Sequence, residues 1–499
     1  MNMQFRTIDA AENAAATGRP ISTAVAVAHG NGIGPEIMSA SLAVLKAAGA
    51  DFEIVPIEVG ERVYRSGVTS GITDDAWDEL RRCKVFYKAP ISTPQGGGFK
   101  SLNVTIRKSL GLYANVRPCL SYAPFVETKH PHMDLVIVRE NEEDLYAGIE
   151  HRQTDDVYQC LKLITRPGCE RIARYAFEYA RAHGRKRVSC FTKDNIMKMT
   201  DGLFHKVFDE IAREYPEIAT DHHIIDIGAA RLADTPEAFD VIVLPNLYGD
   251  VVSDIAAQIS GSVGLAPSAN IGDHGAMFEA IHGSAPDIAG KDLANPSGLL
   301  LAGAMMLDHI GQSDVALTVK NAWLKTIEDG IHTPDIYSKD RSRLSLGTRD
   351  FANAVIDRLG EEPSRLNKAT ASRDTTPIRV TPPAVKPPAK KELVGIDVFV
   401  HTRRPVDELA ALLQEAAEEP FTLTMITNRG VKVWPNGLPE TFCTDHWRCR
   451  FLARSSPALS NNEVLSLLSA LSDAHIDFIK TEHLFNFDGE PGYSLGQGQ

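Results

Sequence analysis

The stretch Asn246-Leu-Tyr-Gly-Asp-Val-Val-Ser-Asp254 joins an apolar run over residues 239–245 to a helical pattern over residues 255–259. The apolar run is short and β-branched, which predicts a buried strand. Asp250 and Asp254 are four residues apart, so both carboxylates should lie on one face of the predicted helix. Two oxygen donors at a strand-to-helix junction suit a divalent cation such as Mg²⁺ or Mn²⁺. The alternative is that the two acidic residues complement the helix dipole.

Other strand-like runs alternate with helical patterns along the chain, which predicts an α/β fold with a parallel sheet. The glycines at residues 29–36 follow one such run, but neither they nor any other stretch forms Gly-x-Gly-x-x-Gly. An ordinary dinucleotide-binding Rossmann site is therefore unsupported, and we interpret this turn as structural. A second glycine-rich segment, residues 272–303, predicts a loop that wraps a ligand through its backbone N–H groups.

Length and charge limit the classes of protein to which the chain can belong. Its 499 residues predict two or three domains, and its net charge of −13 argues against a general binder of nucleic acid or anionic membranes. The seven scattered cysteines contain no Cys-x-x-Cys pair and indicate reduced thiols. Residues 1–20 lack the features of a signal or transit peptide, and no apolar stretch could span a bilayer. These features predict a cytoplasmic location.

Three arginines lie at predicted strand or helix ends within about thirty residues, a spacing that favours a small polyanionic ligand. Arg107 lies one to two turns into a helix that follows a glycine loop, with Ser101 and Asn103 near the start of that helix. Arg117 follows ten residues later, and Arg139 ends another strand. Hydroxyl, amide, guanidinium and helix N–H groups together can bind carboxylates.

The composition changes near residue 361, where a proline-rich stretch predicts a stiff, extended linker. The patterns after it follow the order β-α-β-β-α-β, which predicts a ferredoxin-like module. This module shows no catalytic cluster, and we interpret it as an assembly or regulatory domain.

Several motifs, in this order, resemble those of the β-decarboxylating dehydrogenases, the family of isocitrate, isopropylmalate and homoisocitrate dehydrogenases. They are Gly-Gly-Gly-Phe-Lys-Ser-Leu-Asn-Val-Thr-Ile-Arg, Leu-Tyr-Ala-Asn-Val-Arg-Pro, Arg-Glu-Asn-x-Glu-Asp-x-Tyr, Lys-x-Asn-Ile-Met, Asn-Leu-Tyr-Gly-Asp-x-x-Ser-Asp and His-Gly-Ser-Ala-Pro-Asp-Ile-Ala-Gly. The resemblance covers about residues 20–360, and the extension is similar to that of homodimeric bacterial isocitrate dehydrogenases.

The resemblance implies a two-lobed isopropylmalate-dehydrogenase-like fold, not a Rossmann fold. It divides the chain into a large cofactor-side domain (1–112 and 261–360), a small domain with substrate, metal and dimer interface (113–260), a linker (361–391) and the C-terminal α+β domain (392–499). It also implies a homo-oligomer with the active site shared between subunits.

The family's roles transfer to matching positions of this sequence. Tyr146 and Lys193 of the partner subunit become the acid–base pair, and Asp250, Asp254 and Asp226 of the partner subunit become the metal ligands. The expected ligands of a tricarboxylate substrate are Thr93, Ser101, Asn103, Arg107, Arg117, Arg139 and Asn195. The expected cofactor contacts are His282, Gly283, Ser284, Ala285, Asp287, Ile288 and Asn295. Cations beside Tyr146 are expected to favour its ionised form.

Within the family, polar Ser101 and Asn103 favour isocitrate over isopropylmalate. Asp287 and Ile288 stand where NADP-using relatives carry Lys-Tyr, and an aspartate would repel a 2′-phosphate, so the expected cofactor is NAD. The alternatives are a homoisocitrate or other 3-substituted malate dehydrogenase, an NADP-dependent isocitrate dehydrogenase, and a regulatory subunit without turnover.

Overall fold

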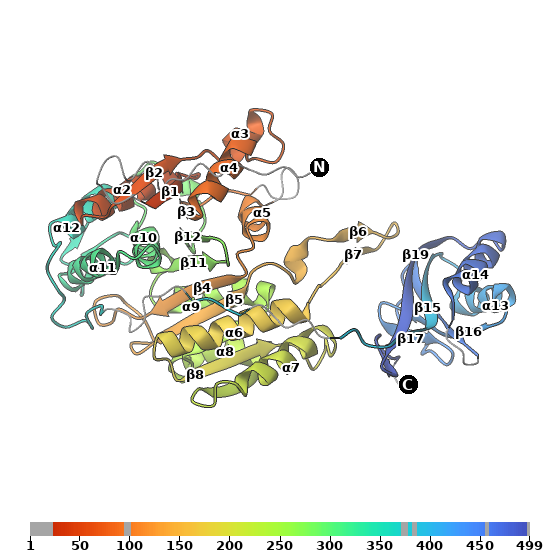
Figure 1. Ribbon diagram of the computed structural model, residues 1–499. Helices are drawn as coiled ribbons and strands as arrows, with labels where there is room; N and C mark the ends of the chain where they lie inside the picture. Colours follow the sequence, from red (N-terminus) through yellow and green to blue (C-terminus); the bar gives the residue numbers. More distant parts are fainter. Residues whose placement is uncertain (1–22, 94–100, 371–377, 382–386, 455–458, 497–499) are drawn as a thin grey trace. The chain divides into compact units, whose positions relative to one another are not determined.

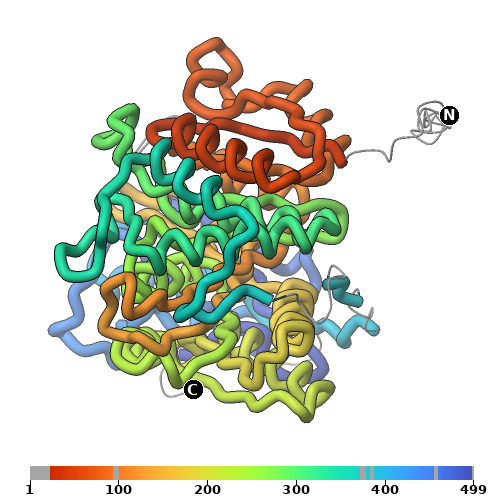
Figure 2. Tube along the Cα trace, turned by 90° about the vertical axis from the view of Figure 1, so that its left-hand side faces the viewer, coloured from red at the N-terminus to blue at the C-terminus, as the bar shows by residue number. Residues whose placement is uncertain are grey.

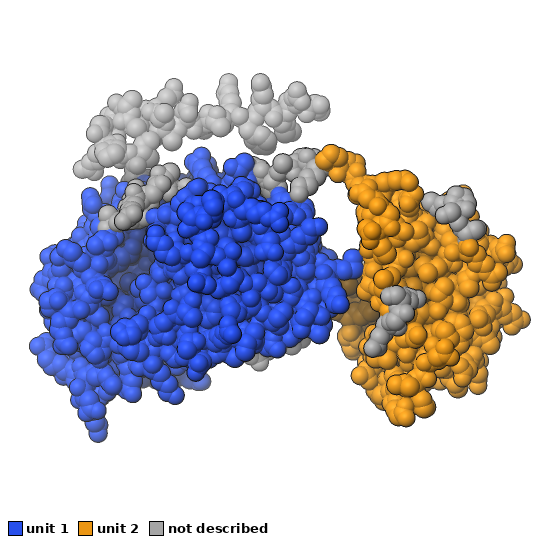
Figure 3. Space-filling model, turned by 90° about the horizontal axis from the view of Figure 1, so that it is seen from below, with its two compact units in different colours: residues 1–147, 162–383 blue, residues 148–161, 384–499 orange. Residues whose placement is uncertain are grey.

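The computed structural model describes residues 23–93, 101–370, 378–381, 387–454 and 459–496. The chain divides into two compact units (Figure 3). Unit 1 comprises residues 1–147 and 162–383, and unit 2 comprises residues 148–161 and 384–499. The predicted glycine loop (residues 94–100), the N-terminal segment (residues 1–22) and part of the linker lie outside the described residues.

A ten-stranded sheet organises unit 1 (Figure 1). Its strands, in spatial order, are β2 (Phe52–Pro56), β1 (Thr23–Ala28), β3 (Val85–Lys88), β12 (Ala276–Ala280), β11 (Pro267–Ile271), β4 (Ala114–Leu120), β5 (Asp134–Glu140), β10 (Val241–Leu244), β8 (Arg187–Thr192) and β9 (Ala219–Ile224). The three pairs β12–β11, β11–β4 and β4–β5 are antiparallel, and every other pair is parallel. Two parallel halves therefore meet at an antiparallel centre, which confirms the predicted two-lobed α/β fold.

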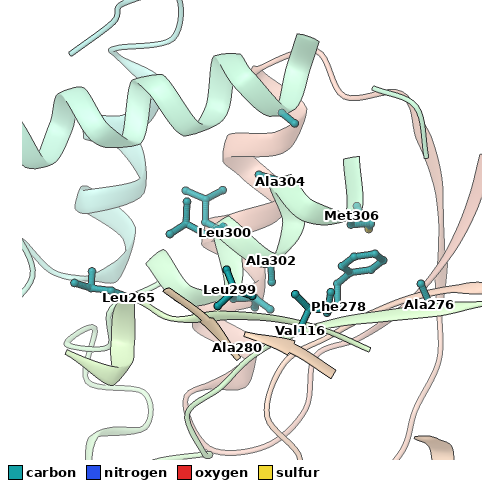
Figure 4. Packing of buried hydrophobic residues seen from close by; sticks show 14 of the residues in the cluster. Val116, Leu265, Ala276, Phe278, Ala280, Leu299, Leu300, Ala302, Ala304 and Met306 are labelled. Atoms are coloured by element: carbon teal, nitrogen blue, oxygen red, sulfur yellow. The ribbon is translucent and has the colours of Figure 1, made fainter. Parts of the chain in front are cut away.

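Helices surround both halves of this sheet (Figures 1 and 2). They are α2 (Gly34–Ala47), α3 (Glu61–Arg65), α4 (Asp74–Cys83), α5 (Leu102–Ser109), α6 (Arg166–Ala182), α7 (Thr200–Ala212), α8 (Ile225–Asp234), α9 (Asn246–Ile259), α10 (Ser297–His309), α11 (Ser313–Glu328) and α12 (Thr348–Ile356). Helix α10 is apolar on nearly all sides and is buried against β11, β12, α2 and α11. Figure 4 shows its residues Leu299, Ala302 and Met306 beside Val116 and Phe278 of the sheet.

One local prediction was wrong in part. Residues 272–303 were expected to form a ligand-wrapping loop, but residues 276–280 form the buried strand β12. The glycines serve the tight turn before β12, because a Cβ at Gly272 would lie 2.4 Å from the backbone oxygen of Gly111. Asp226, one of the expected metal ligands, lies in the first turn of α8.

Unit 2 contains the predicted ferredoxin-like module. Its elements are β15 (Lys391–His401), α13 (Val406–Ala416), β16 (Phe421–Asn428), β18 (His446–Ala453), α14 (Asn461–Asp473) and β19 (Phe478–Phe487). The core strand order β16-β18-β15-β19 is fully antiparallel, with β17 (Val431–Trp434) and β20 (Glu490–Pro491) added at the edges. The hairpin of β6 (Glu150–Arg152) and β7 (Tyr158–Cys160) also belongs to this unit. No helix among the described residues is long and apolar enough to cross a membrane.

Candidate active site

A cleft of about 200 Å³ in unit 1 collects many of the predicted residues. Its lining includes Ser101, Asn103, Arg107, Arg117, Arg139, Tyr146, Asp250, His282 and Gly283. Lys88 and Glu279 also line it, and neither was predicted from the sequence. Lys88 is the last residue of β3, and Arg139 is the next to last of β5, so the position of Lys88 at a strand end was a usable signal.

Helix α9 presents its carboxylates to the arginines of the cleft. Asp250 accepts hydrogen bonds from Arg139 and from the Tyr146 hydroxyl, the latter at 2.5 Å. Arg117 lies 3.6 Å from both Asp250 and Asp254. Burial opposes ionisation of Asp250, but Arg139 and Arg117 outweigh it and lower the pKa of this carboxyl. Burial raises the pKa of Asp254, whose side chain is 65% exposed.

Gly249 allows this approach of helix and arginine. A Cβ at this position would lie 2.4 Å from Cγ of Arg139, whose side chain is only 1% exposed. Any larger residue would push Arg139 away from Asp250. The Gly-Asp pair in the motif therefore has a steric role as well as a chemical one.

The floor of the cleft is a buried charge cluster. Glu279 on β12 pairs with Lys88 and with Arg107, the latter at 2.7 Å, and accepts a hydrogen bond from Asn270 at 2.9 Å. All three charged side chains are at most 8% exposed. Burial opposes ionisation of Glu279, but the two cations hold its pKa well below the usual range. The cluster carries a net positive charge, which suits an anionic ligand.

Three buried polar atoms lining this cleft make no hydrogen bond within the described part of the chain. They are Oδ1 of Asn103, Nε of Arg107 and Nε2 of His282. A buried polar atom without a partner is costly, and a polar ligand in the cleft would satisfy all three. Nε of Arg107 donates and fits a carboxylate, whereas Oδ1 of Asn103 accepts and needs a donor such as a hydroxyl, so the set fits a small hydroxy acid.

Tyr146 lies beside Arg139, with the guanidinium carbon 4.9 Å from the ring centroid. Burial raises the pKa of its phenol, and Arg139 only partly offsets this because Asp250 acts in the same direction as burial. Within this chain the balance favours the neutral phenol, and the expectation that cations favour the ionised form also involves Lys193 of the partner subunit and stays a prediction. Tyr146 is protonated near neutral pH and can donate a proton.

Lys193 and Asp226 pair with each other at 3.0 Å rather than with the cleft residues. The hydrogen bond from Lys193 lowers the pKa of Asp226. Asn195 is exposed nearby. None of the three lines the cleft of the same chain.

The predicted cofactor residues lie on the segment after β12. The backbone oxygen of Ser284 accepts a hydrogen bond from the N–H of Ile33 at 2.9 Å, so the turn near residue 31 supports this segment. Asn295 is buried and bonded to Asp335 and to the N–H of Ser297. Around them lie the half-buried Ile288 and the exposed Gly283, Ala285 and Asp287. Thr93, at the edge of the described region, donates to Ser101 at 3.4 Å.

The fold and the cleft are those of a known protein family. Residues 24–355 match the model of the isocitrate/isopropylmalate dehydrogenase family, and the chain belongs to that family. Residues 391–499 match the model described as bacterial isocitrate dehydrogenase, C-terminal domain.

Particular relatives cover nearly the whole chain. A protein of Rickettsia bellii named isocitrate dehydrogenase [NADP] is 54% identical over 96% of this chain and 99% of its own length. A protein of Thermus thermophilus with the same name is 43% identical over 95% of this chain and 96% of its own. A Thermus thermophilus crystal structure has a TM-score of 0.90 at 42% identity, covering 95% of this chain and 96% of that chain.

These relatives correct the predicted cofactor, NAD, because those that align over the full length are named for NADP. The prediction assumed that Asp287 alone would repel a 2′-phosphate. Asp287 is exposed on a short 3₁₀ turn (Pro286–Ile288) and has no hydrogen-bond partner among the described residues. Water and salt screen such a charge, and the side chain can turn away, so one exposed aspartate is weak grounds for excluding a phosphate.

Proposed function

We propose that the chain catalyses the NADP-dependent oxidative decarboxylation of isocitrate to 2-oxoglutarate and CO₂, with Mg²⁺ or Mn²⁺. The single observation that carries this proposal is the cationic cleft with its three unpartnered polar atoms. The similarity of nearly the whole chain to proteins named isocitrate dehydrogenase [NADP] supports the same proposal. All seven cysteines are free, which supports a reducing, cytoplasmic location.

In the proposed reaction, Arg107, Arg117 and Arg139 bind the substrate carboxylates through charged hydrogen bonds. Ser101 and Asn103 bind the carboxylate that distinguishes isocitrate from isopropylmalate. Thr93 and Asn195 complete the contacts to substrate. Residues 282–288 and Asn295 form the pocket for the adenosine part of the cofactor.

Asp250 and Asp254 offer hard oxygen donors at the mouth of the cleft, which fits a divalent cation. When bound, such a cation stabilises the negative charge that develops on the substrate oxygen. Lys193 of a second copy removes the hydroxyl proton as hydride leaves for the nicotinamide. Tyr146 then donates a proton to the carbon that has lost CO₂.

We propose further that two copies share each site, with Lys193 and Asp226 entering the cleft of the other copy. The pair lies outside the cleft of its own chain and is surrounded by exposed apolar side chains. These are Ile196, Met199, Ile227 and Val251, which are 48–69% exposed. A cluster of exposed apolar residues is typical of a protein interface.

Steady-state kinetics of the purified chain test the activity. We expect kcat/KM to be highest with isocitrate and NADP⁺ in the presence of Mn²⁺, and about tenfold or more lower with homoisocitrate, which differs by one methylene. A higher kcat/KM with NAD⁺ would overturn the cofactor assignment. Complete inactivity of the purified chain would favour the alternative that it is a regulatory subunit without turnover.

Complementation tests the shared site. Lys193→Met and Tyr146→Phe should each be nearly inactive alone. Mixed by co-expression, they should regain about a quarter of wild-type activity, since half of the dimers would be mixed and each would hold one intact site. No recovery would show that both residues act within one chain.

A further inference from the structure

One histidine and two aspartates form a cluster within unit 2, and none of the three lines the cleft of unit 1. Its members are Asp155 in the turn of the β6–β7 hairpin, His401 at the end of β15 and Asp445 just before β18. Each offers one ligand atom, and the three atoms lie within 4.8 Å of one another. Imidazole nitrogen and carboxylate oxygen are both common ligands of Zn²⁺ and related divalent ions.

One oxygen of Asp445 is buried without a hydrogen-bond partner. The side chain of Asp445 is only 1% exposed, and its Oδ2 makes no hydrogen bond within the described part of the chain. Nε2 of His401 lies 3.2 Å from this oxygen, yet the two atoms do not form a hydrogen bond. A buried polar atom without a partner is costly. This oxygen is therefore free to bind a ligand that the chain itself does not supply.

The 3.2 Å between Nε2 of His401 and Oδ2 of Asp445 is close to the spacing of two ligands on one ion. Nitrogen and oxygen ligands lie about 2.0–2.2 Å from Zn²⁺, and in a tetrahedral site this places them about 3.3–3.5 Å from each other. Ligand atoms point at the ion and not at each other. This arrangement accounts for a close contact that is not a hydrogen bond.

Neighbouring side chains orient both of these ligands. Nδ1 of His401 lies 3.4 Å from Oδ2 of Asp477, and Oδ1 of Asp445 accepts a hydrogen bond of 2.6 Å from the Thr154 hydroxyl. A metal-bound histidine usually turns its second ring nitrogen to a carboxylate or carbonyl, and ligating carboxylates are hydrogen-bonded in turn. A proton on Nδ1, facing Asp477, leaves the lone pair on Nε2 to bind an ion.

Backbone hydrogen bonds fix the positions of the three ligands. The N–H groups of residues 401–402 donate to the carbonyls of Asp477 and Asp445, at 2.9 and 3.0 Å respectively. The turn that carries Asp155 is closed by Thr154, whose hydroxyl accepts two backbone N–H groups. The ligands therefore stand on a preorganised backbone, as a metal site requires.

The charge around the cluster favours a cation. Two further carboxylates, those of Asp156 and Asp477, accompany the ligand carboxylates. The arginines that pair with this group are Arg152 and Arg403, with contacts of 3.0 and 3.9 Å. Both arginine side chains are more than half exposed, so their ion pairs are weak, and neither pairs with the buried Asp445.

We propose that Asp155, His401 and Asp445 bind one Zn²⁺ or a similar divalent transition-metal ion, at a site separate from the one proposed at Asp250 and Asp254. The side chains of Asp155 and His401 are 68% and 30% exposed, so the ion enters from solvent and water completes its coordination. The ion joins the β6–β7 hairpin to the C-terminal module inside unit 2. Mg²⁺, which prefers oxygen ligands, binds this site only weakly.

Calorimetric titration of the full chain with ZnCl₂, after treatment with a chelator and in the presence of excess Mg²⁺, tests the proposal. Excess Mg²⁺ occupies an oxygen-rich site such as that of Asp250 and Asp254, so the heat reports on a site with an imidazole ligand. We expect one zinc ion to bind per chain. Absence of zinc binding would overturn the proposal. The titration needs no substrate, so its outcome does not depend on the proposed function.

Variants assign the zinc to this cluster. His401→Gln removes the imidazole, and Asp445→Asn replaces the unpartnered oxygen by an amide group but keeps an oxygen for the Thr154 hydroxyl. Each should weaken zinc binding more than about 100-fold, whereas Asp477→Asn, at a positioning residue, should weaken it about 10–100-fold. His483→Gln, at an exposed histidine of unit 2 outside the cluster, is the matched control and should bind zinc as wild type does. Equal zinc affinity in His401→Gln and this control would refute the proposal, as would full affinity in Asp445→Asn.

Discussion

Replacing Glu279 by glutamine should severely destabilise unit 1. Glutamine keeps the size of the side chain and its hydrogen bond from Asn270, but it removes the carboxylate that pairs with Lys88 and Arg107. Both cations are almost fully buried and would then lie next to each other without a counter-charge. Breaking a buried ion pair from one side leaves an uncompensated charge, which is more costly than losing the pair as a whole.

The contact distance gives the size of the effect. At the 2.7 Å between Arg107 and Glu279, one ion pair in a medium of effective dielectric constant about 20 has a Coulomb energy of about 6 kcal/mol. Relaxation and water entry reduce this, and we expect a loss of about 3–5 kcal/mol in the free energy of unfolding. That is a large part of the stability of an ordinary domain, which is about 5–15 kcal/mol.

Urea unfolding followed by the fluorescence of Trp323, buried in the same unit, measures this loss. The matched control is Glu61→Gln, which breaks an exposed helical pair with Arg65 and should cost less than about 0.5 kcal/mol. Adding Lys88→Met to Glu279→Gln should recover part of the loss, since it removes one unpaired charge. If Glu279→Gln costs no more than Glu61→Gln does, the cluster is not a buried charge cluster and our account of the cleft floor is wrong.

Three further predictions concern other parts of the chain. Tyr146→Phe should lower kcat about 10²–10⁴-fold with little change in the KM for isocitrate, because the ring remains and only the donated proton is lost; an equal rise in KM would contradict this role. Thr154→Val removes the 2.6 Å hydrogen bond to the buried Asp445 and should lower the free energy of unfolding of unit 2 by about 1.5–3 kcal/mol, whereas the exposed control Thr220→Val should change stability by less than about 0.5 kcal/mol. Burial opposes ionisation of Glu328, but hydrogen bonds from residues 364–366 outweigh this effect and lower the pKa of Glu328 from 4.5 to about 2. The ionised Glu328 therefore contributes fully to stability above pH 4.5, and this contribution is lost as the pH falls toward 2. Glu328→Gln should therefore reduce the loss of unfolding free energy between pH 4.5 and 2. An unchanged loss would argue against a stabilising role for these hydrogen bonds.

Local sequence patterns predicted those parts of the structure that depend on near neighbours. The spacing of Asp250 and Asp254 placed both on α9, and the order of strands and helices after residue 391 gave the ferredoxin-like module. In both cases the information is contained in periodicity within one element or in the order of adjacent elements. Such signals do not require knowledge of the tertiary structure.

The missed features depend on contacts between distant segments. Glu279 is the next-to-last residue of β12 and looks like any polar residue in the sequence. Its partners Lys88 and Arg107 lie 191 and 172 positions earlier in the chain. Strand β12 was hidden because glycines flank it, and glycine normally signals a loop.

The hairpin β6–β7 belongs to unit 2 and is joined to unit 1 at both of its ends along the chain. The chain leaves unit 1 directly after Tyr146 and Ala147 and returns at Lys162, which pairs with the buried Asp144 and Asp201 at 3.0 Å each. Asp201 also accepts the N–H of Lys193 at 2.6 Å. One buried network therefore holds both ends of the hairpin and the backbone of Lys193. The tip of the hairpin bonds to Asp445 within unit 2, and the network fixes the points in unit 1 at which the chain leaves and returns.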